Sequence, residues 1–299
     1  MHVFHAMGTE VSVVLPDATE AREAELAHAV ASLFAENERR FSRFDPESEL
    51  SRLNRTSSPL VVSASLFAML LRARTHAERT SGLFDPGIGA ALVAAGYDRS
   101  FAPGALDRAE AMSSSRRASI LELELDPETR TVRRPSHVRL DLGGLVKGVT
   151  VDAASALLPA DAAIDAGGDA ILRGNGDADG GWLVDVEDPS DAEESLLTLR
   201  LRDRAVATSA PNRRRWRRGD AEAHHLVDPR TGLPAQTDLA QVTIVAETTE
   251  RAEVFCKAAF LLGEHGARTL VEASEDLGAV LVRRDGTWLA LGALEVIDA

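Results

Sequence analysis

The sequence predicts an α+β fold in which mixed or antiparallel sheets pack against helices. Strand-like and helix-like segments are interspersed without the regular strand–helix–strand repeat of a doubly wound sheet. The 299 residues are 44% hydrophobic, which is enough to form an ordinary buried core. Because the chain shows neither an internal repeat nor a low-complexity linker, we expect a single domain that covers residues 1–299.

The elements of the N-terminal third follow from local patterns. Residues 3–15 alternate and are rich in Val, which predicts a strand that Pro16 ends. Apolar residues at helical spacing predict helices over 19–40 and 64–79. Ser63 is a suitable N-cap for the second of these helices, and Ser81 and Gly82 are typical of its end.

The rest of the chain reads as strands with fewer helices. Helices are predicted over 146–158 and 250–262. A hairpin is expected at Asp285-Gly286 between strands at 278–282 and 287–291. The remaining predicted strands cover 120–125, 131–134, 137–142, 162–165, 170–173, 182–186, 196–201 and 241–246, with a surface loop over 188–194.

The charge balance argues against nucleic acid as a partner. The chain has 33 Lys and Arg against 47 Asp and Glu, a net charge of −14, and only 4% aromatic residues. This field repels phosphate backbones, and few rings are present to stack on bases. The arginine-rich segment 213–218 around Trp216 therefore reads as a solvated hairpin, or as a rim that attracts an acidic partner, and a nucleic-acid module ranks last.

The composition and the N-terminal sequence indicate where in the cell the protein is expected. The single cysteine, Cys256, lies in an apolar run and reads as a buried small hydrophobic residue, so no disulfide within the chain is possible. Residues 1–15 lack the pattern of a signal peptide, and no apolar stretch is long enough for a membrane anchor. We therefore expect a cytoplasmic protein.

A glycine turn at residues 141–148 has the features of an anion site. A strand is expected to deliver Asp141, two glycines allow close approach of the backbone, and Lys147 falls in the first turn of a helix. Backbone N–H groups at a helix N-terminus, together with an ammonium, suit a diphosphate. A tight turn with an exposed lysine is the alternative, although a cation is unfavourable at that end of a helix.

Two further clusters carry candidate chemistry. Phe84 and Asp85 lie between glycines, where an aromatic ring beside a carboxylate suits a heteroaromatic ligand; a buried Phe with an Asx-turn is the alternative. His224 and His225 precede Asp228. Adjacent histidines in a strand point to opposite faces, so one general base is a better interpretation than a shared metal site. A surface histidine beside a structural turn is the alternative.

Taken together and in order, these clusters resemble the FAD:protein FMN transferase family, the ApbE-like flavin transferases. The resemblance extends over nearly the whole chain and rests on eight motifs rather than on any one of them. The motifs are Met7–Thr9, Phe41–Phe44 with Ser48–Asn54, Gly82–Pro86, Asp141–Gly148, Asp165–Asp169, Ala207–Ser209, His225–Pro234 and Glu253–Ala258.

The resemblance implies a single ApbE-like domain that takes FAD as substrate, uses a divalent cation, usually Mg²⁺, and transfers FMN to a Thr or Ser hydroxyl of an acceptor flavoprotein, releasing AMP. It implies His225 as catalytic base, with Asp228 in position to orient it. It also implies a set of FAD-binding residues: Met7, Phe44, Leu83, Phe84, Asp85, Asp141, Lys147, Asp169 and Leu226.

The sequence departs from the family at the metal site. The family's ligands are an Asp and, four residues later on the same helical face, a Thr, together with a carbonyl of the glycine turn. Here Glu253 and Lys257 occupy the two helical positions, and Gly144 supplies the carbonyl. A carboxylate of Glu can ligate Mg²⁺, whereas a protonated lysine offers no lone pair.

Several interpretations of Lys257 stay open. Its side chain turns away from a more hydrated metal, or its ammonium replaces the metal, or the pair is an ordinary ion pair at i,i+4 spacing. Loss of transfer is a further possibility. An FAD diphosphatase, which would use water in place of the acceptor hydroxyl, and a non-catalytic FAD-binding protein are the alternative functions.

Overall fold

The computed structural model describes residues 1–102, 106–108, 110, 112, 116–176, 180–191 and 193–298. The chain divides into two compact units. The first unit contains residues 1–35, 147–210 and 237–299, and the second contains 36–146 and 211–236.

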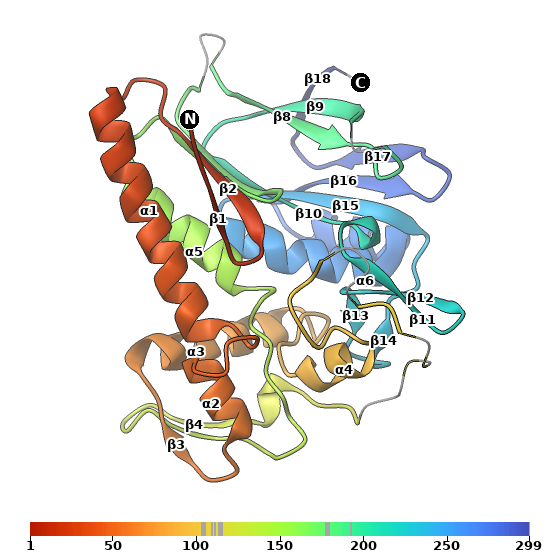
Figure 1. The fold of residues 1–299 in the computed structure, drawn as a ribbon. Helices are drawn as coiled ribbons and strands as arrows, with labels where there is room; N and C mark the ends of the chain where they lie inside the picture. Colours follow the sequence, from red (N-terminus) through yellow and green to blue (C-terminus); the bar gives the residue numbers. More distant parts are fainter. Residues whose placement is uncertain are drawn as a thin grey trace. The chain divides into compact units, whose positions relative to one another are not determined.

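The first unit is built on an eight-stranded sheet (Figure 1). Every neighbouring pair of its strands is antiparallel. Its spatial order is β1 (His2–Ala6), β2 (Thr9–Val14), β6 (Ala162–Ala166), β7 (Asp169–Arg173), β10 (Arg204–Ser209), β15 (Leu239–Ala246), β16 (Gly278–Arg283) and β17 (Trp288–Leu291).

Apolar residues on the two faces of this sheet form two separate cores. On one face, strand residues such as Val13 and Ile164 pack with Phe34 of helix α1 (Glu20–Phe41) and Val151 of α5 (Val146–Ser155). On the other face, residues such as Val206 pack with a three-stranded sheet of β8 (Trp182–Glu187), β9 (Ser195–Leu201) and β18 (Glu295–Asp298). The period of two along each strand explains how one sheet serves both cores.

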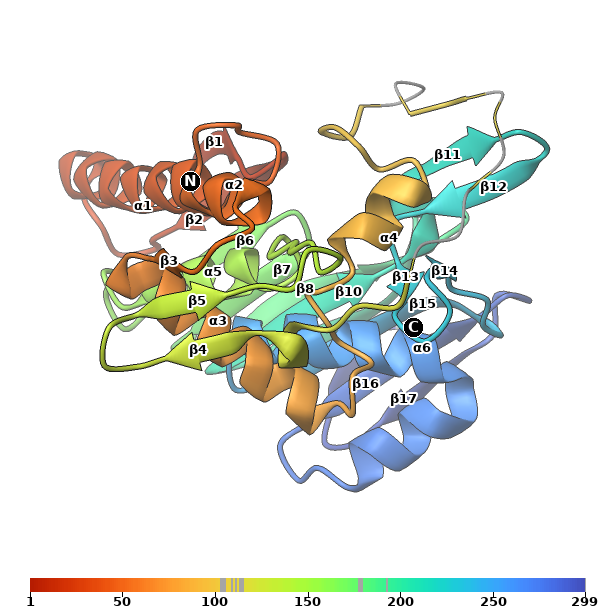
Figure 2. The ribbon, with the colours of Figure 1, turned by 90° about the horizontal axis from the view of Figure 1, so that it is seen from below.

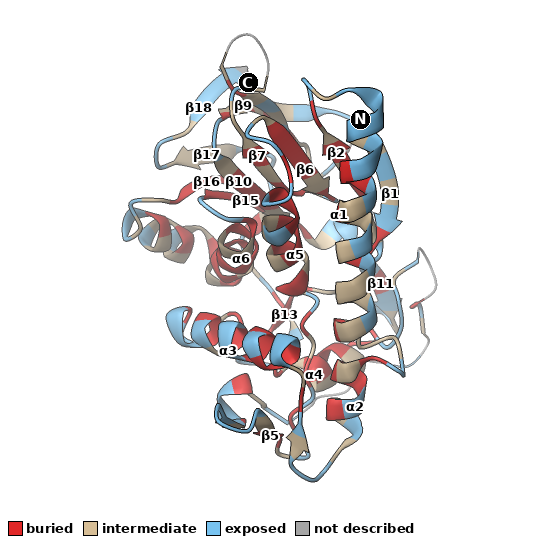
Figure 3. Cartoon of the chain, turned by 90° about the vertical axis from the view of Figure 1, so that its left-hand side faces the viewer, coloured by how far each residue is buried: buried red, intermediate tan, exposed pale blue. Residues whose placement is uncertain are grey.

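Helix α6 (Thr249–Glu272) packs on β10 and β15, and Figure 3 shows its buried and exposed faces. Thr248 caps its first turn, and Gly263, at φ 70°, breaks the helix into two segments. No helix in the described part of the chain combines the length and the apolar content that a membrane span requires.

The second unit contains short elements around the long helix α3 (Ala64–Arg79). Two further helices, α2 (Glu49–Arg55) and α4 (Gly89–Ala94), lie in it, and Figure 2 shows α4 beside the hairpin of β11 and β12. The other elements are β3 (Leu60–Val61), η1 (Ile120–Glu122), β4 (Glu124–Asp126), β5 (Thr131–Arg133), η2 (Pro211–Arg213), β11 (Arg215–Arg218), β12 (Ala221–His224), β13 (Val227–Asp228) and β14 (Leu233–Pro234).

The structure confirms the α+β prediction and its strongest local signals. The side chain of Ser63 accepts a hydrogen bond from the N–H of Leu66, and α3 ends at Arg79 with Thr80 as its C-cap. The hairpin at Asp285-Gly286 joins β16 to β17. The single domain predicted over 1–299 stays a prediction.

Three strand predictions were wrong. Residues 3–15 form two strands, because Met7 and Gly8, at φ 52° and 70°, make a turn between β1 and β2. Residues 120–125 begin as the 3-10 turn η1, which Ser119 and Glu122 close as a capping box. Residues 137–142 form no strand; Arg139 makes only an isolated bridge with Ile88.

The ends of two predicted helices also differ from the structure. The helix expected over 146–158 ends at Ser155. The helix expected over 250–262 resumes after Gly263 and continues to Glu272. The side-chain oxygen of Asp238 accepts a hydrogen bond from the N–H of Glu264 at 3.1 Å, which satisfies a free donor at the start of the second segment.

Candidate active site

Lys147, a predicted site residue in the first unit, lies in the first turn of α5. Its Nζ lies 2.7 Å from Oδ2 of Asp169 and donates to the carbonyl of Ala166 at 2.9 Å. Asp169 begins β7, directly after the turn at Gly167 and Gly168, which have φ 65° and 90°. The carboxylate of Asp169 therefore compensates a cation that is unfavourable at a helix N-terminus.

The second pair is Glu253 and Lys257, one turn apart on α6. The Nζ of Lys257 lies 3.2 Å from Oε1 of Glu253 and donates to the Glu253 carbonyl at 3.3 Å. The other oxygen, Oε2, accepts a hydrogen bond from the N–H of Gly148 at 3.0 Å. Both oxygens of this buried carboxylate thus have partners within the first unit.

Helices α5 and α6 are held together where these two pairs lie. A Cβ on Gly148 would come within 2.9 Å of the backbone of Glu250, so glycine is required for this approach. The carboxylate of Asp152 in α5 accepts hydrogen bonds from the N–H groups of Thr249 and Glu250, at 2.8 and 2.9 Å. Burial raises the pKa of Asp152, and these hydrogen bonds oppose the rise.

The four side chains Lys147, Asp169, Glu253 and Lys257 form what we call the charge cluster. Burial raises the pKa of Glu253; the charge of Lys257 opposes the rise, that of Asp169 adds to it, and that of Lys147 opposes it. The four groups therefore interact electrostatically, and with both carboxyls ionised their formal charges sum to zero.

The charge cluster does not fit a divalent cation. One oxygen of Glu253 faces an ammonium and the other accepts a backbone N–H, and the nearby carboxylate of Asp169 is paired with Lys147. Lysine offers no lone pair to a metal. Among the described residues, no three His, Cys, Asp or Glu side chains are grouped in a way that could hold a metal ion. The role of the Gly144 carbonyl as the third ligand stays a prediction.

Met7 is the remaining candidate in the first unit. It lies in the turn between β1 and β2 at φ 52° and packs against the core that contains Val13 and Phe34. Its predicted contact with FAD stays a prediction.

In the second unit, Asp141 is paired with Arg43. The guanidinium of Arg43 forms an ion pair with the carboxylate of Asp141 and donates to the carbonyl of Tyr97 at 2.7 Å. It also lies over the rings of Phe44 and Tyr97, with its central carbon 4.0 and 4.7 Å from the ring centroids. The other oxygen of Asp141 accepts the N–H of Gly143 at 2.8 Å.

Arg43 was not predicted as a site residue. It lies in the motif Phe41–Phe44, from which only Phe44 was predicted to bind FAD. A buried arginine requires a partner, but its separation from Asp141 by 98 residues hides the pairing from any local pattern.

Phe84 is buried and Asp85 forms an Asx-turn, which is the alternative that the sequence offered to ligand binding. Phe84 is buried edge-to-face against His76, with the ring centroids 6.2 Å apart. The Oδ1 of Asp85 accepts the N–H of Gly87 at 2.7 Å, which is an Asx-turn, and the N–H of Ile120 at 2.8 Å. Burial raises the pKa of Asp85. The predicted contacts of Leu83, Phe84 and Asp85 with FAD stay predictions.

The two histidines differ in position. His224 is the last residue of β12, and His225 follows it, outside the strand that we expected to hold both. The Nε2 of His224 lies 3.2 Å from the carbonyl of Ala235, and the Nδ1 of His225 lies 3.4 Å from that of Arg214. His225 is half-buried.

Asp228 binds Arg230 with both oxygens. Oδ1 and Oδ2 lie 2.9 and 3.0 Å from Nε of Arg230, and Oδ2 accepts from its terminal nitrogen at 2.7 Å. This ion pair raises the pKa of Arg230. The orienting role of Asp228 toward His225 stays a prediction, as does the contact of the buried Leu226 with FAD.

The arginine-rich segment forms a hairpin, as expected, but its tryptophan is buried. Trp216 packs on Tyr97, with ring centroids 5.5 Å apart, and its indole N–H donates to the carbonyl of Ala95 at 2.9 Å. A ring engaged in this way is not available for stacking on a base.

Solved structures share this fold. An ApbE protein from Thermotoga maritima superposes with a TM-score of 0.84 at 24% identity, and the match covers 96% of this chain and 95% of that one. The flavin transferase ApbE from Vibrio cholerae gives a TM-score of 0.79 at 21% identity, with 98% and 96% covered. The fold is therefore that of the ApbE proteins.

Sequence comparison gives the same assignment. An FAD:protein FMN transferase from Treponema pallidum is 31% identical over 279 residues, which are 86% of this chain and 76% of that protein. One from Haemophilus influenzae is 25% identical over 295 residues, or 93% of this chain and 85% of that protein. The model of the ApbE family matches residues 7–281, and the chain belongs to this family.

Proposed function

We propose that this protein is a flavin transferase that moves FMN from FAD to the hydroxyl of a Thr or Ser on an acceptor protein and releases AMP. The observation that carries the proposal is the 31% identity, over 86% of the chain, to a relative named FAD:protein FMN transferase. The location of the protein in the cytoplasm stays a prediction.

The reaction exchanges one P–O bond for another. The acceptor oxygen forms a bond to the phosphorus of the FMN half, the bond from that phosphorus to the AMP phosphate breaks, and AMP leaves with the electron pair. A Thr or Ser hydroxyl is a weak nucleophile until a base removes its proton. His225 takes this proton, because the pKa typical of an imidazole suits proton transfer near neutrality.

Residues of the glycine turn and of α5 serve the diphosphate. Lys147 balances negative charge that develops on the departing AMP, the contribution expected of a fixed cation in phosphoryl-type transfer. The side chain of Lys147 is 15% exposed, whereas that of its partner Asp169 is 6% exposed, so the lysine is the more accessible member of the pair. Met7, Phe44, Leu83, Phe84, Asp85, Asp141, Asp169 and Leu226 complete the proposed FAD-binding set.

A divalent cation has no step in this mechanism. Magnesium was part of our expectation from the family, but the partners of Glu253 leave it no ligand set in the charge cluster.

Mass spectrometry tests the proposal directly. The protein is incubated with FAD and a folded acceptor domain that contains the target threonine, and we expect the acceptor to gain the mass of an FMN group while AMP appears in equal amount. Free FMN and AMP without a mass shift would instead indicate an FAD diphosphatase. Intact FAD that co-purifies without turnover would indicate a binding protein.

The His225→Ala variant tests the base. Removing a general base lowers the rate by about 10² to 10⁴-fold, so we expect transfer to fall by this factor while FAD still binds. The neighbouring variant His224→Ala is the matched control, since it removes the same chemistry one residue away. Transfer at the wild-type rate in His225→Ala, or equal losses in the two variants, would contradict the role of His225.

A further inference from the structure

We propose that the ammonium of Lys257 is the resident cation of the diphosphate site, so that this protein binds and uses FAD without a divalent metal ion. The inference rests on the proposed function. It concerns a residue of this chain for which the resemblance supplies no role, since the family places a metal ligand at this position.

The position of Lys257 is fixed by two contacts on its own helix. Its Nζ lies 3.2 Å from Oε1 of Glu253 and 3.3 Å from the Glu253 carbonyl. A carboxylate that is buried in this way requires a positive partner, and a metal ion or an ammonium can fulfil that requirement. In this chain the ammonium does so.

The pair differs from an ordinary helix ion pair in its burial. The side chain of Glu253 is only 3% exposed, compared with 57% for Glu78, which pairs with Arg74 at the same i,i+4 spacing in α3. An exposed pair such as Arg74–Glu78 contributes little to stability and requires no other explanation. The burial of Glu253, together with the bond from Gly148 to its second oxygen, shows a carboxylate built to hold a cation.

The charge cluster offers two cations to a ligand. The side chains of Lys257 and Lys147 are 24% and 15% exposed, whereas their partners Glu253 and Asp169 are 3% and 6% exposed. The two lysine side chains are therefore more accessible than the carboxylates with which they pair. Two ammonium groups match the two phosphates of FAD, and charge-assisted hydrogen bonds to phosphate oxygens are among the strong ones.

The ammonium groups of Lys147 and Lys257 also support the transfer of FMN. The bond that breaks joins the two phosphates, and AMP leaves with an additional negative charge that a nearby ammonium can stabilise. The proton of the acceptor hydroxyl goes to His225, so the step needs no other co-reactant.

The first experiment measures FAD binding to the wild-type protein by quenching of flavin fluorescence, in EDTA and in MgCl₂. We expect the same Kd in both. Electron paramagnetic resonance of added Mn²⁺, with FAD present, is expected to show no ion bound to the protein. A loss of FAD affinity of about tenfold or more in EDTA, the size of one charge-assisted hydrogen bond, would overturn the inference, as would one protein-bound Mn²⁺ per chain.

Variants of the pair provide the second experiment. In Lys257→Thr we expect FAD affinity in EDTA to fall by about tenfold, because one charge-assisted contact is lost. The double variant Glu253→Asp with Lys257→Thr restores the ligand pair of the family, and we expect it to bind Mn²⁺ and to recover FAD affinity when metal is added. Arg268→Thr, at another i,i+4 pair of α6, is the matched control and should change neither property.

The outcomes separate this inference from the proposed function. No FAD binding in either buffer would overturn the flavin transferase and with it this inference. Binding that requires magnesium would overturn only the role of Lys257. If Lys257→Thr does not fold, the wild-type measurements in EDTA and with Mn²⁺ decide the question without it.

Discussion

Single side chains in this protein derive their roles from partners far away in the sequence. Arg43 is an example, because its guanidinium contacts Asp141, the carbonyl of Tyr97 and two aromatic rings at once. Its side chain is only 3% exposed. Removing it would leave the Asp141 carboxylate, which is itself largely buried, without its countercharge.

We expect Arg43→Met to destabilise the protein by about 3 kcal/mol, the usual effect of removing one partner from a buried ion pair. The free energy of unfolding is measured by urea denaturation. Arg22→Met is the matched control, since Arg22 and Glu25 are 56% and 69% exposed and such a pair contributes about 0.5 kcal/mol. Equal losses in the two variants would show that Arg43 does not carry a buried charge interaction.

At the scale of elements, local sequence signals were reliable where capping and periodicity agreed. Helix α3 has Ser63 as N-cap and a regular apolar face, and it was predicted with its observed bounds. The short elements α2, α4, β3 and β10 were missed, because such segments are stabilised by partners rather than by their own pattern. Strand β10, for example, is defined by pairing with β7 and β15.

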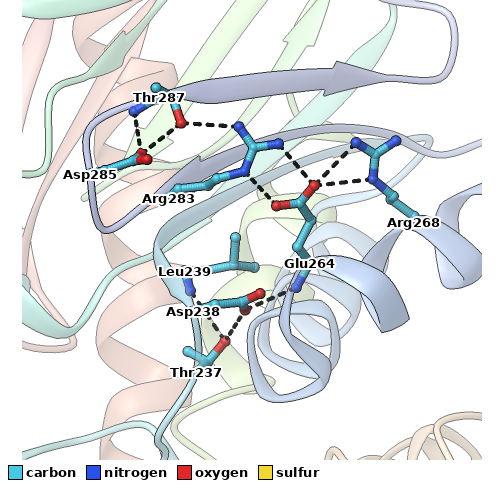
Figure 4. Close-up of polar contacts among 8 residues, drawn as sticks. All are labelled: Thr237, Asp238, Leu239, Glu264, Arg268, Arg283, Asp285 and Thr287. Carbon is cyan, nitrogen blue, oxygen red and sulfur yellow. Dashed lines mark hydrogen bonds and ion pairs between the residues drawn. The ribbon is translucent and has the colours of Figure 1, made fainter.

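The break in α6 shows how one element is held to its neighbour. Glu264 begins the second segment and pairs with Arg268 one turn later and with Arg283 of β16 (Figure 4). Arg283 also donates to Thr287, which in turn is bound by Asp285. The pKa of Glu264 is lowered from 4.5 to about 2, mainly by the hydrogen bonds that Arg283 donates to it.

This shift predicts how stability depends on pH. A carboxyl whose pKa is lower in the folded state stabilises the protein above its unfolded pKa, and this contribution is lost as the pH falls from 4.5 to about 2. Glu264→Gln removes it. We therefore expect the variant to be less stable than the wild type at pH 7, with the difference shrinking below pH 4.5 and small near pH 2.

Urea denaturation over this pH range provides the measurement. Glu128→Gln, which makes the same change at an exposed carboxyl in the turn between β4 and β5, is the control. A constant difference between Glu264→Gln and the wild type down to pH 2 would contradict the lowered pKa of Glu264.

At the scale of the whole molecule, the net charge and the burial of Trp216 argue against a nucleic-acid-binding function. The net charge is −14, and the one tryptophan of the arginine-rich segment is buried against Tyr97. The guanidinium of Arg218 donates to the Glu110 carbonyl, and the backbone N–H of Arg217 donates to the carboxylate of Asp107. Because Trp216 is buried, the tryptophan of this hairpin is not available as a stacking platform for nucleic acid.

We expect no duplex DNA binding tighter than about 10⁻⁴ M at physiological salt, the weak end of non-specific binding. Fluorescence anisotropy of a labelled duplex, measured over a range of salt concentrations, provides the test. Salt-sensitive binding that disappears in Arg215→Ala with Arg217→Ala would revive the nucleic-acid interpretation.

The sequence by itself determined the fold class, the long helices and the order of the motifs that led to the ApbE family, because these depend on periodicity, capping and residue identity along the chain. Only the tertiary structure decided that Arg43 holds Asp141, that Phe84 and Asp85 have structural partners, and that Lys257 neutralises a buried Glu253. Ion pairs and hydrogen bonds act over a few ångströms in space. Their partners in this chain are up to 121 residues apart, a separation that no local pattern records.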